Sequence, residues 1–142
     1  HPSARVIPKQ KLADDFVTDF VLVVNDARGD SFYFVEIEKA THKVFNKDYS
    51  LTKAVNHAID QIVDWDIWLE RNKSFLQNKP ELSGFETPKY MIVIGRVNEN
   101  DLIAKEKLRA YSRNYKTEIL TYDDLLINLK HYISRLKDLK KN

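Results

Sequence analysis

Two strand-like segments joined by a short turn constrain the fold of this chain more than any other feature. Residues 16–25 (FVTDFVLVVN) and 31–38 (SFYFVEIE) are rich in Val and Phe, which is typical of β-strands. The residues between them, 26–30 (DARGD), form a turn sequence in which Gly29 can adopt a positive φ. This pattern predicts a β-hairpin near the start of the chain.

The segment after the hairpin has a helical period. Apolar residues recur at spacings of three and four from Leu51 to Leu69, which predicts a helix that reaches about Phe75. Ser50 is the expected N-cap, although Lys53 stands where a capping box would have Glu. We therefore expect one long helix with an apolar stripe.

The remaining segments complete an alternation of strands and helices. Residues 1–15 have no convincing period and are expected to be a lead-in, whereas residues 76–88 hold two prolines and a glycine and are expected to be a surface loop. The later predicted elements are a buried strand at 90–95, a helix at 99–114, a strand at 117–121 and a final helix that opens at Thr121 or Tyr122. The order β-β-α-β-α-β-α predicts one α/β unit.

Composition limits the class of protein. With 142 residues and no internal repeat, residues 1–142 are expected to form a single domain. The net charge of +2 is too small to indicate nucleic-acid binding by itself, and the absence of Cys excludes disulfides and thiolate zinc sites and fits a reducing compartment. No apolar run approaches the ~20 residues that a membrane span needs. Because the chain begins His1-Pro2-Ser3 without Met, we expect a fragment of a longer protein.

Three carboxylates are expected to meet on one face of the hairpin. Glu36 and Glu38 share a face of their strand because successive side chains alternate. A two- or four-residue loop centred on residues 27–28 pairs residue i with residue 55 − i and places Asp19 opposite Glu36. A three-residue loop would place Asp19 opposite Ile37 instead. The prediction therefore depends on the turn.

A divalent cation would relieve the repulsion among these three carboxylates. Mg²⁺ prefers oxygen ligands and usually takes one or two carboxylates, with waters and phosphate oxygens completing its shell. The alternative is that Asp19, Glu36 and Glu38 are polar residues of an edge strand that face water. Gln61, at the margin of the helical apolar stripe, could reach toward the sheet with His57 one turn earlier, or both could be surface residues of the helix.

The spacing Asp19-x16-Glu36-Ile37-Glu38, followed by a helix that carries Gln61, resembles the PD-(D/E)XK nuclease superfamily. A closer resemblance is to the C-terminal nuclease domain of Shedu anti-phage defence proteins, and it covers about residues 5–130. It implies an α/β fold with a restriction-endonuclease-like core, in which helices flank a mixed central sheet. The segments that carry it are 34–48 (FVEIEKATHKVFNKD), 54–72 (AVNHAIDQIVDWDIWLERN), 91–96 (MIVIGR) and 119–126 (ILTYDDLL).

The resemblance also implies roles for single residues. Asp19 and Glu36 match the acids that bind the metal, Mg²⁺ or Mn²⁺, and Gln61 matches the polar residue contributed by the following helix. Glu38 stands where the superfamily usually has Lys, so it would act as general base or as an additional ligand. The positive charge of that Lys then has to come from elsewhere, and the local candidates are Lys39, Lys43 and Lys53.

As a whole, the resemblance implies a metal-dependent endonuclease that hydrolyses phosphodiester bonds of DNA in bacterial defence against phage. It further implies a homo-oligomer in the cytoplasm, not in a membrane, regulated by an upstream domain of the same protein. One alternative is a catalytically degenerate nuclease fold that binds DNA ends, and another is an oligomerisation module with helix 51–69 as its interface. The basic end of the chain, residues 130–141, suits either a phosphate-binding arm or an exposed helix end.

Overall fold

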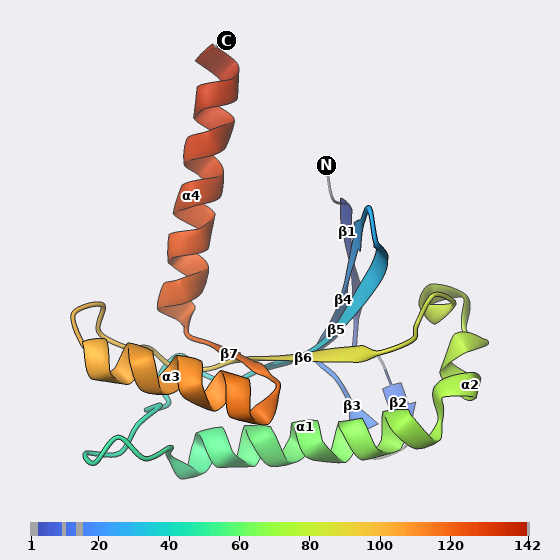
Figure 1. The fold of residues 1–142 in the computed structure, drawn as a ribbon, viewed down its shortest axis with the longest axis horizontal. Helices are drawn as coiled ribbons and strands as arrows, with labels where there is room; N and C mark the ends of the chain where they lie inside the picture. Colours follow the sequence, from blue (N-terminus) through green and yellow to red (C-terminus); the bar gives the residue numbers. More distant parts are fainter. Residues whose placement is uncertain (1–2, 10, 14–15, 142) are drawn as a thin grey trace.

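The computed structural model describes residues 3–9, 11–13 and 16–141 of the chain. Figure 1 shows how its strands and helices are arranged. In chain order these elements are β1 (Ser3–Pro8), β2 (Lys11–Ala13), β3 (Phe16–Val17), β4 (Phe20–Asp26), β5 (Gly29–Ile37), α1 (Lys53–Arg71), α2 (Lys73–Gln77), the 3-10 helix η1 (Pro80–Leu82), β6 (Pro88–Val93), α3 (Leu102–Tyr115), β7 (Glu118–Leu120) and α4 (Tyr122–Lys141).

One mixed sheet organises the fold. Its five strands have the order β1-β4-β5-β6-β7, and β2 pairs with β3 in a separate two-stranded sheet. Strands β1, β4 and β5 are antiparallel, whereas β5, β6 and β7 are parallel. Helix α1 lies along one face of the sheet, and α4 projects away on the other side (Figure 1). The predicted α/β fold with a mixed sheet and helices is therefore confirmed.

The β4–β5 hairpin has one of the two registers that the sequence left open, the one that places Asp19 opposite Glu36. Its pairs run from Phe20 opposite Val35 to Asp26 opposite Gly29, so that residues 27–28 form a two-residue turn. Gly29 has a φ of 108°, which a residue with a side chain rarely adopts. In every pair the two residue numbers sum to 55, as expected for a two-residue loop at residues 27–28.

The expected lead-in at residues 1–15 is wrong over much of its length. β1 pairs with β4 from Ser3 opposite Asn25 to Pro8 opposite Phe20. Such a short edge strand has no periodic signal of its own, because its pairing depends on backbone hydrogen bonds to a strand later in the chain. Sequence patterns within the segment therefore did not identify it.

The first predicted strand, 16–25, is interrupted. β3 ends at Val17 and β4 begins at Phe20. Of the two residues between them, Thr18 is fully buried and Asp19 is exposed. The break leaves Asp19 just outside the hydrogen-bonded ladder of β4 and β5.

The long helix is shorter than predicted. α1 ends at Arg71, and α2 follows after Asn72. The Asn72 side-chain amide donates to the carbonyl of Trp68 at 2.8 Å, so the side chain competes with the helical hydrogen-bond pattern. Ser50 as the N-cap is also wrong, because Thr52 precedes the helix.

The expectation of a surface loop at residues 76–88 is wrong as well. Leu82 and Phe85 within it are fully buried. The ring of Phe85 packs edge-on against those of Phe32 and Phe34, with centroids 5.8 Å apart in both pairs. The prolines and the glycine break the helix here, but the apolar side chains of the segment belong to the core.

The core lies between α1 and the sheet. This packing uses the apolar face of helix 51–69, which is therefore not available as an oligomer interface. The buried residues on the two sides are Val55, Ala58, Ile62, Trp65 and Leu69 of α1 and Val21, Val23, Phe32, Phe34, Tyr90 and Ile92 of the sheet. Among the described residues, no helix combines the length and the apolarity needed to cross a membrane.

Candidate functional site

The three predicted carboxylates lie where β4 begins and β5 ends. Asp19 directly precedes β4, Glu36 is the second-last residue of β5, and Glu38 directly follows β5. The first pair of the β4–β5 ladder is Phe20 opposite Val35. The same register, continued outward by one residue on each strand, places Asp19 beside Glu36. The predicted pairing of these two acids follows from the observed register.

Asp19 is held by two backbone contacts. Its Oδ2 accepts a hydrogen bond from the N–H of Ile37 at 2.7 Å, and its carbonyl oxygen accepts one from the N–H of Lys9 at 2.8 Å. The first bond ties the Asp19 side chain to the residue between Glu36 and Glu38. Because Asp19 is exposed, its carboxylate remains accessible to a ligand from solvent.

Glu36 is the central member of the group. Burial raises its pKa most, and the charges of Asp19 and Glu38 and a hydrogen bond with Glu38 raise it further, from an ordinary value of 4.5 to about 8. β5 lies between β4 and β6, so Glu36 is not on an edge strand. The alternative of three water-facing edge residues is therefore wrong for Glu36. The site concentrates negative charge that a cation would offset.

Glu38 is anchored by the elements that follow it. Its N–H donates to the carbonyl of Val93 at 2.8 Å, which extends the contact between β5 and β6. Its carbonyl accepts a hydrogen bond from the hydroxyl of Tyr122 at 2.6 Å, at the start of α4. The carboxylate lies 3.9 Å from Nε2 of His42. Two distant elements thus fix the backbone from which this side chain projects.

His42 is a site residue that the sequence analysis misses. Its N–H donates to the carbonyl of Lys39 at 3.2 Å, and this turn brings the imidazole back to Glu38. The spacing of four residues is a weak signal outside a helix, because the contact depends on the turn. The lysines named as local candidates, Lys39, Lys43 and Lys53, are all exposed.

Gln61 lies on α1, which covers the face of the sheet from which Glu36 projects. Phe34, two residues earlier on the same face of β5, packs in the core with α1. The Oε1 atom of Gln61 is buried, and within the described part of the chain it has no hydrogen-bond partner. A buried acceptor without a donor costs about 1–3 kcal/mol, so the atom marks a place for a water or a ligand. His57, one turn earlier, is exposed.

The donor set fits a hard cation held largely by solvent and substrate oxygens. Among the residues that the structure describes, no group of three or more His, Cys, Asp and Glu side chains could hold a metal ion. Asp19 and Glu36 nevertheless offer two carboxylates, a number that Mg²⁺ usually takes alongside waters and phosphate oxygens. The partly buried Glu36 and the buried Oε1 of Gln61 are both compatible with a bound ligand. The residues thus fit Mg²⁺ or Mn²⁺ in an open shell, not in a closed protein cage.

A comparison with protein families identifies the relationship. The family described as Shedu protein SduA, C-terminal, matches residues 2–126. The chain belongs to this family. The match includes all four predicted site residues and ends at Leu126, in the second turn of α4. A search of curated proteins found no match.

The resemblance to Shedu C-terminal domains is therefore confirmed, and it indicates a role in Shedu defence. The segments by which the chain resembles these domains also build the carboxylate site. Glu36, Glu38 and His42 lie in the segment 34–48, and Gln61 lies in the segment 54–72.

Removing the Glu36 charge should stabilise the metal-free Shedu domain at alkaline pH. A carboxyl with a folded pKa of about 8 and an ordinary pKa of 4.5 stabilises the fold fully below pH 4.5 and loses that contribution as the pH rises through 8. The full shift corresponds to roughly 4–5 kcal/mol, and partial solvent access reduces the expected effect to about 2 kcal/mol.

Urea unfolding in EDTA measures this effect. Glu36→Gln should exceed wild type by about 2 kcal/mol near pH 9 and equal it below about pH 4.5. Glu86→Gln, at an exposed glutamate, is the control and should match wild type at both values. A Glu36→Gln difference that does not change with pH would contradict the raised pKa.

Proposed function

We propose that this Shedu domain is a Mg²⁺- or Mn²⁺-dependent endonuclease that hydrolyses phosphodiester bonds in DNA, on a restriction-endonuclease-like core of the PD-(D/E)XK type. The observation that carries the proposal is the partly buried Glu36 with Asp19 and Glu38 beside it: burial raises the pKa of Glu36 most, and the two neighbouring charges raise it further, to about 8. Such a concentration of partly buried negative charge opposes folding, and a bound divalent cation would offset it. Phosphate oxygens of DNA would complete the coordination shell.

Asp19 and Glu36 would hold the metal ion. Their carboxylates come from adjacent strands, and the N–H of Ile37 fixes one oxygen of Asp19. When bound, the ion would offset charge on the scissile phosphate and make a nearby water more acidic. Glu36 must lose its proton before it can serve as a ligand, so binding should release a proton and be favoured at higher pH.

Glu38 and Gln61 would act on the attacking water. Hydrolysis forms a bond between the water oxygen and phosphorus and breaks the ester P–O bond. The water loses a proton, and the leaving oxygen gains one from solvent. Ionised Glu38 can accept the proton of the water. The amide of Gln61 can donate and accept, so its buried Oε1 would orient the water or the substrate.

His42 is the residue we propose for the positive charge that Lys supplies in the superfamily motif. Its Nε2 lies 3.9 Å from the carboxylate of Glu38, which occupies the motif position. A protonated imidazole donates from both ring nitrogens and can stabilise negative charge on a phosphate. Among the described residues, no ion pair or hydrogen bond places Lys39, Lys43 or Lys53 beside Glu38, whereas His42 lies beside it.

Cleavage of DNA in the presence and absence of metal tests the proposal. Linear, circular and single-stranded DNA are incubated with the domain in Mg²⁺, Mn²⁺ or EDTA. We expect strand breaks with either metal and none in EDTA, since the carboxylates cannot offset the charge of the phosphate without the ion. DNA that is bound but stays intact with every metal would contradict the proposal. It would favour the degenerate fold that binds DNA ends.

The Shedu relationship also leads us to propose a setting for this activity. The domain would act on phage DNA in the bacterial cytoplasm, as part of a homo-oligomer. An upstream domain of the same protein would regulate it. The resemblance to Shedu proteins supports these properties, and the cleavage assay does not depend on them.

A further inference from the structure

A pocket of about 300 Å³ lies beside the carboxylate site. Two loops form it, residues 43–49 before α1 and residues 96–101 before α3, and both lie at the end of the domain where these helices begin (Figure 1). The first loop directly follows His42. The second directly follows Gly95, whose backbone lies so close to the carbonyl oxygen of His42 that a Cβ would collide with it. The pocket therefore begins where the carboxylate site ends.

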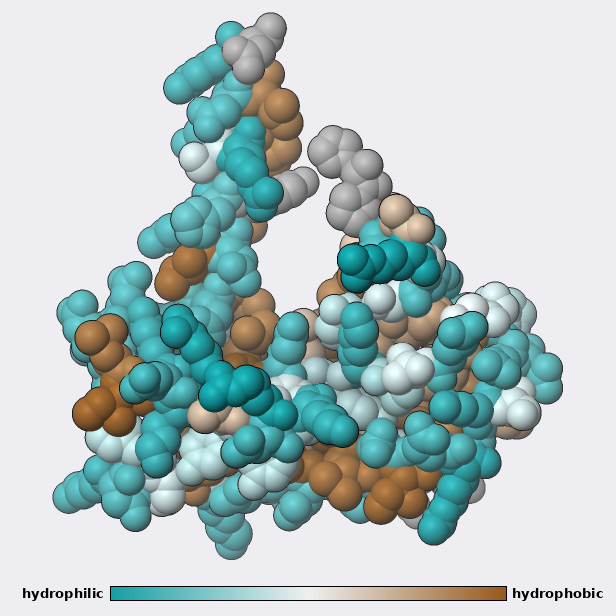
Figure 2. Space-filling view, in the orientation of Figure 1, coloured by the Kyte–Doolittle hydropathy of each residue, from teal (hydrophilic) through white to brown (hydrophobic). Residues whose placement is uncertain are grey.

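Three basic side chains line the pocket, namely those of Lys43, Lys47 and Arg96. Within the described part of the chain, neither lysine forms an ion pair. Arg96 donates to Asp123 from Nε at 3.2 Å and from Nη2 at 2.6 Å, and its side chain is still 64% exposed. Figure 2 shows largely hydrophilic side chains at the lower left, where the segment 43–49 lies in Figure 1. The pocket thus offers positive charge to a ligand from solvent.

The acid that lines the pocket, Asp101, is occupied by donors of the protein itself. Its Oδ1 accepts a hydrogen bond from the N–H of Ala104 at 3.0 Å and so caps α3, and the hydroxyl of Tyr49 lies 3.2 Å from both carboxylate oxygens. Tyr49 has a φ of 61°, a conformation that costs a residue with a side chain about 1–3 kcal/mol. This strained turn directs Tyr49, and not a lysine, to the acid.

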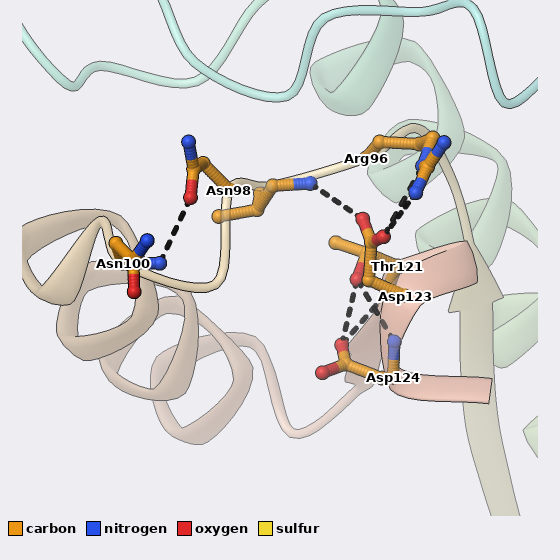
Figure 3. A network of polar contacts seen from close by, with 7 residues as sticks. Arg96, Asn98, Asn100, Thr121, Asp123 and Asp124 are labelled. Atoms are coloured by element: carbon orange, nitrogen blue, oxygen red, sulfur yellow. Dashed lines mark hydrogen bonds and ion pairs between the residues drawn. The ribbon is translucent and has the colours of Figure 1, made fainter. Parts of the chain in front are cut away.

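Both walls of the pocket are held in place without a ligand. In the first wall, the carbonyl of Lys43 accepts a hydrogen bond from the hydroxyl of Thr52 at 2.6 Å. In the second wall, Asp123 binds Arg96 and also accepts from the N–H of Val97 at 3.0 Å (Figure 3). A site that is ordered beforehand loses less conformational entropy when its ligand binds.

We propose that this pocket binds a phosphate group of the DNA backbone, next to the phosphate that is cut. The inference rests on the proposed nuclease function, because it states where the same DNA strand continues beyond the carboxylate site. Lys43 and Lys47 would share this one phosphate, together with the side of the Arg96 guanidinium that Asp123 does not bind. Lysine and arginine are the side chains that neutralise backbone phosphates in protein–DNA complexes.

Such a pocket would offset an electrostatic problem of the carboxylate site. Asp19, Glu36 and Glu38 repel a DNA phosphate, and one divalent cation offsets only part of their charge. Positive charge beside the site would attract the strand against this repulsion. Holding the neighbouring phosphate would also limit the movement of the scissile phosphate relative to the metal. Lys43 and Lys47 are thus positioning residues.

DNA binding at several salt concentrations tests the proposal. Fluorescence anisotropy of a labelled duplex in EDTA, where the proposed nuclease does not cut, measures the affinity between about 50 and 200 mM KCl. For a protein that neutralises Z phosphates, the logarithm of the affinity falls against the logarithm of the salt concentration with a slope of about −0.9Z. Lys43→Gln/Lys47→Gln should therefore reduce this slope by about 0.9 and weaken binding roughly eightfold at 0.1 M salt.

Two matched variants control for charge and for position. Lys43→Arg/Lys47→Arg keeps both charges and should retain the wild-type slope. Lys73→Gln/Lys79→Gln removes two charges in and after α2, at the far end of α1 (Figure 1), and should bind DNA like wild type. Because Lys43 and Lys47 are exposed, both substitutions at these positions should keep the melting temperature of the wild-type domain.

The outcomes separate this inference from the proposed nuclease function. An unchanged slope for Lys43→Gln/Lys47→Gln would overturn the inference, even if the domain cuts DNA. A decrease of about 1.8 would also overturn it, because each lysine would then bind its own phosphate. A decrease of about 0.9 in a domain that cuts DNA with no metal would retain the phosphate site and contradict the nuclease function. A domain that binds no DNA at all would overturn both.

Discussion

Asn in place of Asp19 should reduce metal-dependent DNA cleavage by this Shedu domain at least about 100-fold while leaving it folded. The loss corresponds to about 2.7 kcal/mol of transition-state stabilisation, which is within the several kcal/mol that a bound metal supplies. Asn removes the negative charge that would hold the ion. Its side-chain oxygen can still accept the hydrogen bond from the N–H of Ile37, which is 2.7 Å long in the wild type.

A matched control separates charge from hydrogen bonding. Asp26, at the other end of the same hairpin, also accepts a backbone hydrogen bond at 2.7 Å, from the N–H of Arg28. Asp26→Asn should therefore cleave DNA like wild type. Cleavage rates under excess Mg²⁺, together with thermal melting, measure both effects. If Asp19→Asn cuts DNA at the wild-type rate, Asp19 holds no metal and the site must be reassigned.

Ala in place of Gly95 should destabilise the domain by about 3 kcal/mol or more. Gly95 has a φ of 63°, where a side chain is strained. A Cβ there would also collide with the carbonyl oxygen of His42 and lie 2.9 Å from Cγ2 of Val44. Strain and overpacking each cost about 1–3 kcal/mol.

Gly95 matters to the site because it joins three of the segments that form it. Its N–H donates to the carbonyl of Lys39 at 3.2 Å, and its carbonyl accepts from the N–H of Tyr122 at 3.0 Å. Tyr122 in turn donates to the carbonyl of Glu38. A larger residue would therefore displace the segment that carries Glu38 and His42.

Urea unfolding compares this substitution with a second glycine. A Cβ at Gly84 would meet Asp30 at an ordinary contact distance of 3.4 Å. Gly84→Ala should therefore change the free energy of unfolding by less than about 1 kcal/mol. A Gly95→Ala domain as stable as Gly84→Ala would show that the segment around His42 can move away without cost.

Local patterns were sufficient for the parts of the fold that depend on neighbours in the sequence. The turn at residues 27–28 has two residues, and this length alone sets which residues of β4 and β5 face one another. The meeting of Asp19 and Glu36 follows from that register. The apolar spacing of α1 likewise predicted the face that packs on the sheet, because helical side chains repeat every three to four residues.

Contacts between distant segments decided the rest. β1 is a strand because β4 offers it hydrogen bonds, and Phe85 is buried because Phe32 and Phe34 lie beneath it. No period within 1–15 or 76–88 carries that information. The resemblance to Shedu domains named the site residues, but the place of β5 between β4 and β6 decided the electrostatics of Glu36.

The sequence by itself therefore determined the hairpin and the acids on it and limited its register to two alternatives, since turn chemistry and side-chain alternation act over a few residues. The two-residue turn of the structure selected between these registers. Tertiary structure alone decided that Glu36 is partly buried and that the turn after β5 brings His42 to Glu38. Burial and charge depend on every element packed around a residue. A sequence pattern shows the chemical type of a residue, but it does not show which residues from distant segments surround it.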